Sequence, residues 1–105
     1  MKEVSVSELK KMKDSGEDFQ LIDVREIDEF ETCNLGGTLI PMGEIMDNTD
    51  KISKDKKVVI HCRSGKRSAS VILVLESQLG LKNLYNLKGG ITAWSQEIDP
   101  SLPIY

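Results

Sequence analysis

The chain has 105 residues, a net charge of −3 from 14 basic and 17 acidic side chains, and 39% hydrophobic residues. This composition suits one small globular domain, residues 1-105, and the acidic balance argues against a broad nucleic-acid-binding face. The longest apolar run, residues 71–75, is far shorter than the roughly 20 residues of a membrane span. Because the first residues also lack the apolar stretch of a secretory signal, we expect a cytoplasmic protein that binds neither nucleic acid nor membrane.

The apolar residues predict alternating helices and strands along the chain. In chain order we expect a helix at 5–16, a strand at 19–23, a helix at 27–31, a turn with a short strand at 34–41, a weak helix at 42–50, a strand at 57–61, a helix from 68 to 80, a strand at 84–85 and a helix at 91–97. This alternation is typical of an α/β domain built on a parallel sheet.

Local signals support several of these boundaries. Ser5, followed three residues later by Glu8, has the pattern of a capping box, and Gly16 marks the end of the first helix. In the weak helix we expect Ile45 and Met46 to face inward.

The chemistry is expected in the loop that follows the strand at 57–61. That strand has three consecutive β-branched residues, which suit a buried parallel strand, and it leads directly into Cys62-Arg63-Ser64-Gly65-Lys66-Arg67-Ser68. A nucleophile at the end of a parallel strand lies where α/β sheets place their ligand sites. The N–H groups of the next helix and of the loop form an anion-binding site, and Gly65 allows the backbone to turn tightly.

Three positive charges lie in this loop, on Arg63, Lys66 and Arg67. Because a helix N-terminus and basic neighbours lower the pKa of a thiol, we expect Cys62 to be a thiolate at neutral pH. The same field would hold an anionic substrate, and no separate general base is required. His61, the only histidine, precedes Cys62 on the strand, where successive side chains point to opposite faces.

Each candidate also has a structural interpretation. Cys62 could be an inert buried thiol, as free cysteines often are, but its polar basic loop favours a reactive one. His61 is interpreted as a packed or hydrogen-bonded residue rather than a catalyst. Cys33, without a basic neighbour, is interpreted as a partly buried residue rather than a second reactive thiol. One histidine and two cysteines do not suggest a metal cluster, so we expect no metal and no cofactor.

Three motifs together resemble those of the rhodanese-like domain family. They are residues 21–26 (LIDVRE) followed by Glu29-Phe30, residues 58–68 (VVIHCRSGKRS) and residues 87–94 (LKGGITAW), in the family's order and covering nearly the whole chain. The resemblance implies a five-stranded parallel sheet flanked by helices on both faces.

The resemblance also implies a sulfurtransferase of the thiosulfate (rhodanese) type. In such enzymes the catalytic thiolate takes the outer sulfur of a small anionic donor such as thiosulfate and becomes a persulfide. An acceptor such as cyanide or a thiol, including a protein thiol, then removes that sulfur.

Carried over by position, Cys62 is the catalytic sulfur carrier and the loop after it binds the substrate. The loop backbone, including Ser64 and Gly65, would surround the persulfide. Arg63 and Lys66 would offer positive charge to the anionic donor.

The last basic residue of the loop also belongs to the substrate-binding set, and three further residues are expected to support the site without binding substrate. Arg67 would brace the loop as well as add charge, and Ser68 closes the loop. Asp23 and Arg25 lie at another strand end, where we expect a structural role and hydrogen bonds toward the loop region.

One segment departs from the family pattern. Members often read Gly-His-Ile-Pro-Gly-Ala where this chain has residues 33–38 (CNLGGT), so that Asn34 replaces the histidine and Gly36 the proline. The departure concerns a turn and leaves the active-site loop intact.

Two other functions remain open on these residues. Cys-dependent phosphatases use a similar loop, but it is one residue longer than the present one, in which four residues separate Cys62 from Arg67. Other rhodanese-like domains have lost the cysteine and act as non-catalytic docking modules. Because Cys62 is present, a partner-specific sulfur relay is the closer alternative.

Overall fold

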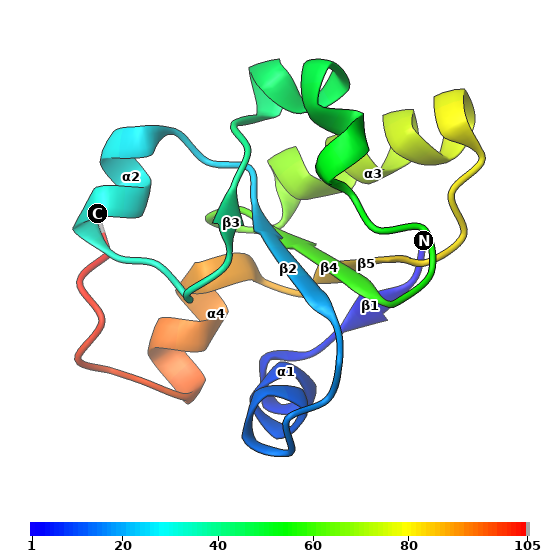
Figure 1. Cartoon of the computed structure of the whole chain (residues 1–105). Coiled ribbons are helices and arrows are strands. Elements are labelled where there is room, and N and C mark those ends of the chain that lie inside the picture. Colours follow the sequence, from blue (N-terminus) through cyan, green and yellow to red (C-terminus); the bar gives the residue numbers. More distant parts are fainter. Residues whose placement is uncertain (105) are drawn as a thin grey trace.

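The computed structural model describes residues 1–104, which form a sheet between layers of helices (Figure 1). The strands are β1 (Glu3–Val4), β2 (Gln20–Asp23), β3 (Thr38–Leu39), β4 (Val58–His61) and β5 (Leu84–Leu87). The helices are α1 (Val6–Asp14), α2 (Ile27–Thr32), the 3-10 helix η1 (Met42–Lys51), α3 (Lys66–Leu79) and α4 (Gly90–Glu97).

The strands form one parallel sheet in the order β1-β5-β4-β2-β3. The predicted α/β fold with a five-stranded parallel sheet is therefore confirmed. The strand β1 was not among the elements predicted from residue patterns, because two residues carry no periodicity. It is defined only by its pairing with β5, where Val4 lies opposite Leu87.

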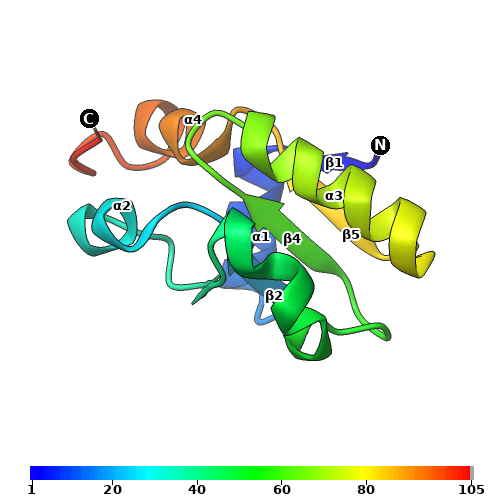
Figure 2. The ribbon, with the colours of Figure 1, turned by 90° about the horizontal axis from the view of Figure 1, so that it is seen from above.

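Helices cover both faces of the sheet (Figures 1 and 2). Successive residues of β4 point to opposite faces, as a strand requires. Val58 and Ile60 pack with residues of α3 and η1, whereas Val59 packs with residues of α1 and α4. No helix among residues 1–104 combines the length and apolar character that crossing a bilayer demands.

The predicted start of the first helix is confirmed in detail. The Ser5 hydroxyl accepts the Glu8 N–H, and the Glu8 carboxylate accepts the Ser5 N–H. The inward position predicted for Met46 is wrong, since 45% of this residue is exposed while Ile45 is buried. The reason is that η1 is a 3-10 helix, whose three residues per turn separate neighbouring side chains more widely than expected for an α-helix.

The parallel register brings several polar residues to one edge of the sheet. His61 of β4 lies opposite Asp23 of β2, and Asn86 of β5 lies opposite Ile60. Cys62 follows β4 directly at this carboxyl edge, where α/β sheets place their ligand sites.

Candidate functional site

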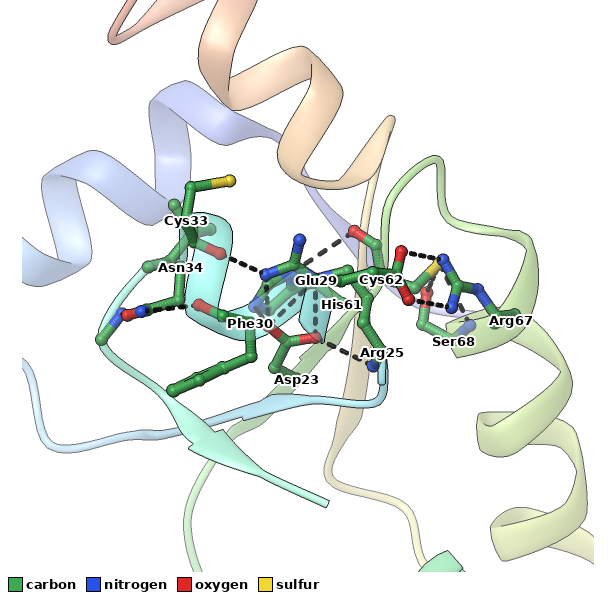
Figure 3. Close-up of polar contacts among 12 residues, drawn as sticks. Asp23, Arg25, Glu29, Phe30, Cys33, Asn34, His61, Cys62, Arg67 and Ser68 are labelled. Carbon is green, nitrogen blue, oxygen red and sulfur yellow. Dashed lines mark hydrogen bonds and ion pairs between the residues drawn. The ribbon is translucent and has the colours of Figure 1, made fainter. Parts of the chain in front are cut away.

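The loop from Cys62 turns sharply into α3 (Figure 3). Gly65 is the N-cap of α3 and has φ = +104°, a left-handed conformation that glycine adopts without strain. The helix therefore begins at Lys66, two residues earlier than the sequence pattern predicted. Because the turn is so tight, the first amides of α3 face back toward the cysteine.

Hydrogen-bond donors converge on the Cys62 sulfur. The Gly65 N–H lies 3.1 Å from Sγ and the Ser68 N–H lies 3.5 Å from it. The Ser68 hydroxyl is 3.4 Å from the same atom. The anion-binding loop predicted from the sequence thus has the sulfur as its target.

The N-terminus of α4 holds the start of this loop. The Ile91 N–H donates to the Cys62 carbonyl and the Thr92 N–H to the Arg63 carbonyl, both at 3.0 Å. At Gly90 a Cβ atom would lie 2.4 Å from the Arg63 carbonyl oxygen, so only glycine permits this approach. These bonds commit the first two carbonyls of the loop to α4.

The balance of these contacts lowers the pKa of Cys62. Burial raises the pKa of this thiol, since only 1% of the residue is exposed. The Ser68 hydroxyl and amide and the backbone amides of Gly65 and Ser64 lower it by more. The arrangement favours a thiolate without a neighbouring base.

The three basic residues of the loop have different environments. Arg63 and Lys66 are exposed and free to meet an anion in solvent. Arg67 is half-buried and binds both carboxylate oxygens of Glu29, at 2.7 and 2.9 Å. The Arg67 guanidinium holds the pKa of Glu29 at about 2, so this pair stays ionised and ties α3 to α2.

His61 does not face the sulfur. Its ring is fully buried, with Nε2 at 3.7 Å from Asp23 Oδ2 and Nδ1 at 3.5 Å from the Cys62 carbonyl. Burial lowers the pKa of His61 to about 4, so the ring is neutral at physiological pH. Within residues 1–104 its Nε2 has no hydrogen-bond partner.

Asp23 and Arg25 form a buried ion pair behind the end of β4. Arg25 Nη2 lies 2.8 Å from Asp23 Oδ2, and Nε lies 3.0 and 3.1 Å from the two carboxylate oxygens. The same Nη2 donates to the Cys33 carbonyl at 2.7 Å. The hydrogen bonds of this pair therefore fix the turn after α2 rather than reaching the loop after Cys62.

Asn86 is a site residue that the sequence reasoning missed. Its Nδ2 donates to the Gly65 carbonyl at 3.1 Å, and its Oδ1 accepts the Ser68 hydroxyl at 2.6 Å. The signal that could have identified it is a polar residue in an otherwise apolar strand beside the strand that carries Cys62. Glu29 was part of a motif, but its role as the partner of Arg67 required the structure.

A separate cavity of about 470 Å³ opens beside the start of β2, away from the carboxyl edge of the sheet. It is lined by residues such as Phe19, Gln20 and Thr38, and by none of the loop after Cys62. The Gln20 amide is already bonded to Ser53 N–H and to the Lys51 carbonyl. No cluster of three or more His, Cys, Asp or Glu side chains suited to a metal ion occurs within residues 1–104.

Comparison with known proteins identifies the rhodanese-like domain family by sequence and by structure. The family model of the rhodanese-like domain matches residues 5–97. The chain is 39% identical over 101 residues to the Bacillus subtilis protein "Putative sulfurtransferase YtwF", with 95% of this chain and 96% of that one covered. It superposes with a TM-score of 0.84 on a rhodanese-like domain protein from Staphylococcus aureus, at 33% identity and covering 100% and 99% of the two chains.

Some relatives are much longer than this chain. It is 40% identical over 113 residues to "Rhodanese-like/PpiC domain-containing protein 12, chloroplastic" from Arabidopsis thaliana, and the match covers 100% of this chain. The chain spans 38% of the length of that plant protein.

Proposed function

The chain belongs to the rhodanese-like domain family, and on that premise we propose that it is a sulfurtransferase that carries a sulfane sulfur on Cys62. The observation that carries the proposal is the set of donors at Sγ: two backbone amides and one hydroxyl within 3.5 Å. The two amides stabilise a negative charge on sulfur before any substrate arrives, and the hydroxyl adds to them when it turns its proton toward the sulfur.

In the first half-reaction the Cys62 thiolate attacks the outer sulfur of a donor such as thiosulfate. A new S–S bond forms to Cys62 while the S–S bond of thiosulfate breaks, and sulfite leaves with the bonding electron pair. The products are the anionic Cys62 persulfide and sulfite, so charge is conserved and no proton is transferred. Exposed Arg63 and Lys66 would attract the dianionic donor to the loop.

In the second half-reaction an acceptor attacks the outer sulfur of the persulfide. Cyanide would leave as thiocyanate, and a thiolate would itself become a persulfide. In either case the Cys62 thiolate is the leaving group and returns to the donors of its loop. The lowered pKa of Cys62 makes it a better leaving group, which assists this step.

The position of Arg67 argues against phosphate-ester hydrolysis as the alternative. A free guanidinium beside the cysteine would bind a tetrahedral phosphate through two parallel hydrogen bonds. Arg67 instead has both of its terminal nitrogens on Glu29. Its bidentate bond braces the loop and leaves the anion to the backbone amides.

A relay to one protein thiol is a narrower form of the same function. Because Cys62 is almost fully enclosed, an acceptor must approach closely along the loop. A macromolecular acceptor would meet the exposed Arg63 and Lys66 first. We therefore include a protein thiol among the acceptors to be tested.

Intact-protein mass spectrometry tests the proposal. The protein is incubated with thiosulfate without reductant, and then cyanide is added. We expect one sulfur to be gained on Cys62 and then lost with formation of thiocyanate. If no sulfur is gained from thiosulfate or another sulfane donor, the proposed function is wrong, and a phosphate-ester assay and partner capture then separate the other two functions.

A further inference from the structure

Asn86 closes a ring of hydrogen bonds behind Cys62, and neither half-reaction described above uses it. The residue is buried, with 5% of its surface exposed. Its amide binds the Gly65 carbonyl at 3.1 Å and the Ser68 hydroxyl at 2.6 Å. Gly65 and Ser68 both have donors that reach Cys62 Sγ. One side chain therefore holds both neighbours of the sulfur.

The partners of Asn86 fix which way its amide points. A carbonyl can only accept a hydrogen bond, so the Gly65 oxygen must face the NH₂ end. The amide oxygen then faces Ser68, which must direct its single hydroxyl proton to that oxygen. The Ser68 oxygen lies 2.6 Å from this acceptor and 3.4 Å from Cys62 Sγ, so the amide is the nearer of the two.

This orientation affects how Ser68 meets the cysteine. With its proton on Asn86, the Ser68 oxygen turns lone pairs toward Sγ, which suits a thiol S–H rather than a thiolate. When Cys62 ionises, the hydroxyl must rotate toward the sulfur and give up its bond to Asn86. Ser68 can therefore stabilise the thiolate only by the difference between the two hydrogen bonds.

We propose that Asn86 is a positioning residue for Cys62, because it competes with the sulfur for the Ser68 proton while it holds the Gly65 amide against the sulfur. The two actions have opposite signs. Competition for the Ser68 proton raises the pKa of Cys62. The hydrogen bond from Asn86 to the Gly65 carbonyl lowers that pKa, because it keeps the Gly65 N–H in place beside the thiolate.

The consequence for sulfur transfer rests on the proposed function. Cys62 is the nucleophile when it takes up sulfur and the leaving group when it gives sulfur away. A thiolate loses nucleophilicity as its pKa falls, whereas a leaving thiolate departs faster. Through Ser68, Asn86 shifts this balance toward sulfur uptake.

A double-mutant cycle separates the two actions. The variants are Asn86→Leu, Ser68→Ala and their combination, all made with Cys33→Ser so that Cys62 is the only thiol. The readout is the rate of alkylation by iodoacetamide as a function of pH, which gives the pKa of Cys62 without any sulfur donor. Thermal unfolding checks that each variant folds, and Asn86→Ala serves if leucine is not accommodated.

The proposal predicts the sign of the coupling. With Ser68 absent, Asn86→Leu loses only the hold on Gly65, and the pKa of Cys62 rises. With Ser68 present, the same substitution also frees the hydroxyl to donate to the thiolate. The change in the pKa of Cys62 that Asn86→Leu causes is therefore about one unit more negative in the protein that keeps Ser68 than in the Ser68→Ala protein. A coupling of zero or of the opposite sign would overturn the proposal, and so would a loss of stability with no change in the pH profile. A chain that shows the coupling but takes up no sulfur would keep the role of Asn86 and remove the proposed function.

Discussion

The two cysteines of this chain both lie near the carboxyl edge of the sheet. The polar groups around them differ in which atoms they bind. The Cys62 loop, residues 62–68, directs backbone amides and a hydroxyl at a sulfur atom. The Asp23 cluster, formed by Asp23, Arg25, Cys33 and His61, directs a guanidinium at a carboxylate and at the backbone carbonyl of Cys33. Figure 3 shows the two groups side by side.

The comparison shows that an arginine beside a cysteine can be committed to other partners, as Arg25 is to the Asp23 carboxylate and the Cys33 backbone carbonyl. In the Asp23 cluster the charge of Arg25 is matched within the fold, since the paired side chains of Arg25 and Asp23 are 3% and 1% exposed. Burial lowers the pKa of Arg25, but its bonds to Asp23 raise it by more, so the pair is a fixed structural element. In the Cys62 loop the amides of Gly65 and Ser68 point at the sulfur, and within residues 1–104 no carboxylate faces them there. The first group stabilises the fold, and we propose that the second carries the chemistry.

The comparison is tested most strongly by replacing each cysteine in turn. Cys62→Ser should abolish sulfur transfer, because the hydroxyl cannot form a persulfide. Cys33→Ser should retain most of the activity, because the Arg25 bond is made to the backbone carbonyl of residue 33. The measurement is the thiocyanate produced from thiosulfate and cyanide by each variant. Equal losses in both would show that the roles of the two cysteines are misassigned.

Removing the carboxylate of the Asp23 cluster should give the next largest effect, on stability. Asp23→Ala leaves the Arg25 guanidinium buried without its partner, which we expect to lower the free energy of unfolding by about 3–5 kcal/mol. The matched control is Asp18→Ala, which breaks an exposed ion pair with Lys56 and should change stability by less than about 1 kcal/mol. Urea unfolding measures both. A variant at position 23 that is stable but inactive would move Asp23 from the structural group to the catalytic one.

Glu29 connects the two regions, and its ionisation predicts a pH dependence. The pKa of Glu29 is lowered from 4.5 to about 2 by Arg67, so the stability it contributes is fully present above pH 4.5 and is lost as the pH falls toward 2. Glu29→Gln removes this contribution, so stability should fall less steeply with acid across that window. Unfolding followed at several pH values measures the slope, and an unchanged slope contradicts the role given to the Glu29–Arg67 pair.

The smallest effect is expected at the exposed edge of the Cys62 loop. Lys66→Ala should raise KM for thiosulfate by up to about fivefold, because an exposed charge contributes at most about 1 kcal/mol. The control is Lys54→Ala, at an exposed lysine that precedes β4 and so lies toward the opposite edge of the sheet from the loop, and it should leave KM unchanged. Thermal unfolding should be the same for both variants. If thiosulfate kinetics are unaffected by Lys66→Ala, this lysine does not take part in donor binding.

Much of this arrangement follows from local sequence signals. The β-branched strand before Cys62, the glycine in the loop and the helix after it are sufficient to predict an anion-binding turn, because each is a property of neighbouring residues. The first helix was equally predictable from Ser5 and Glu8. Where the local geometry was unusual, the prediction failed: β1 is too short to show a pattern, and the 3-10 helix η1 exposes Met46.

Contacts between distant segments could not be predicted. Asn86 meets Gly65 and Ser68 only because β5 pairs with β4, and Arg67 meets Glu29 across 38 residues of sequence. A sequence shows which side chains can form such bonds, but the packing of α2 and α3 against the sheet decides which of them do. The hydrogen bonds of Asp23 and Arg25 illustrate this, since they reach Cys33 rather than the Cys62 loop.

We infer that the Cys62 loop itself, without a general base, makes Cys62 acidic. The most direct measurement is the pH dependence of Cys62 alkylation in the Cys33→Ser variant. We expect a single titration with its midpoint below the ordinary thiol pKa of about 8.5. A midpoint at or above that value would mean that burial outweighs the amides and the Ser68 hydroxyl, and the claim would then be contradicted.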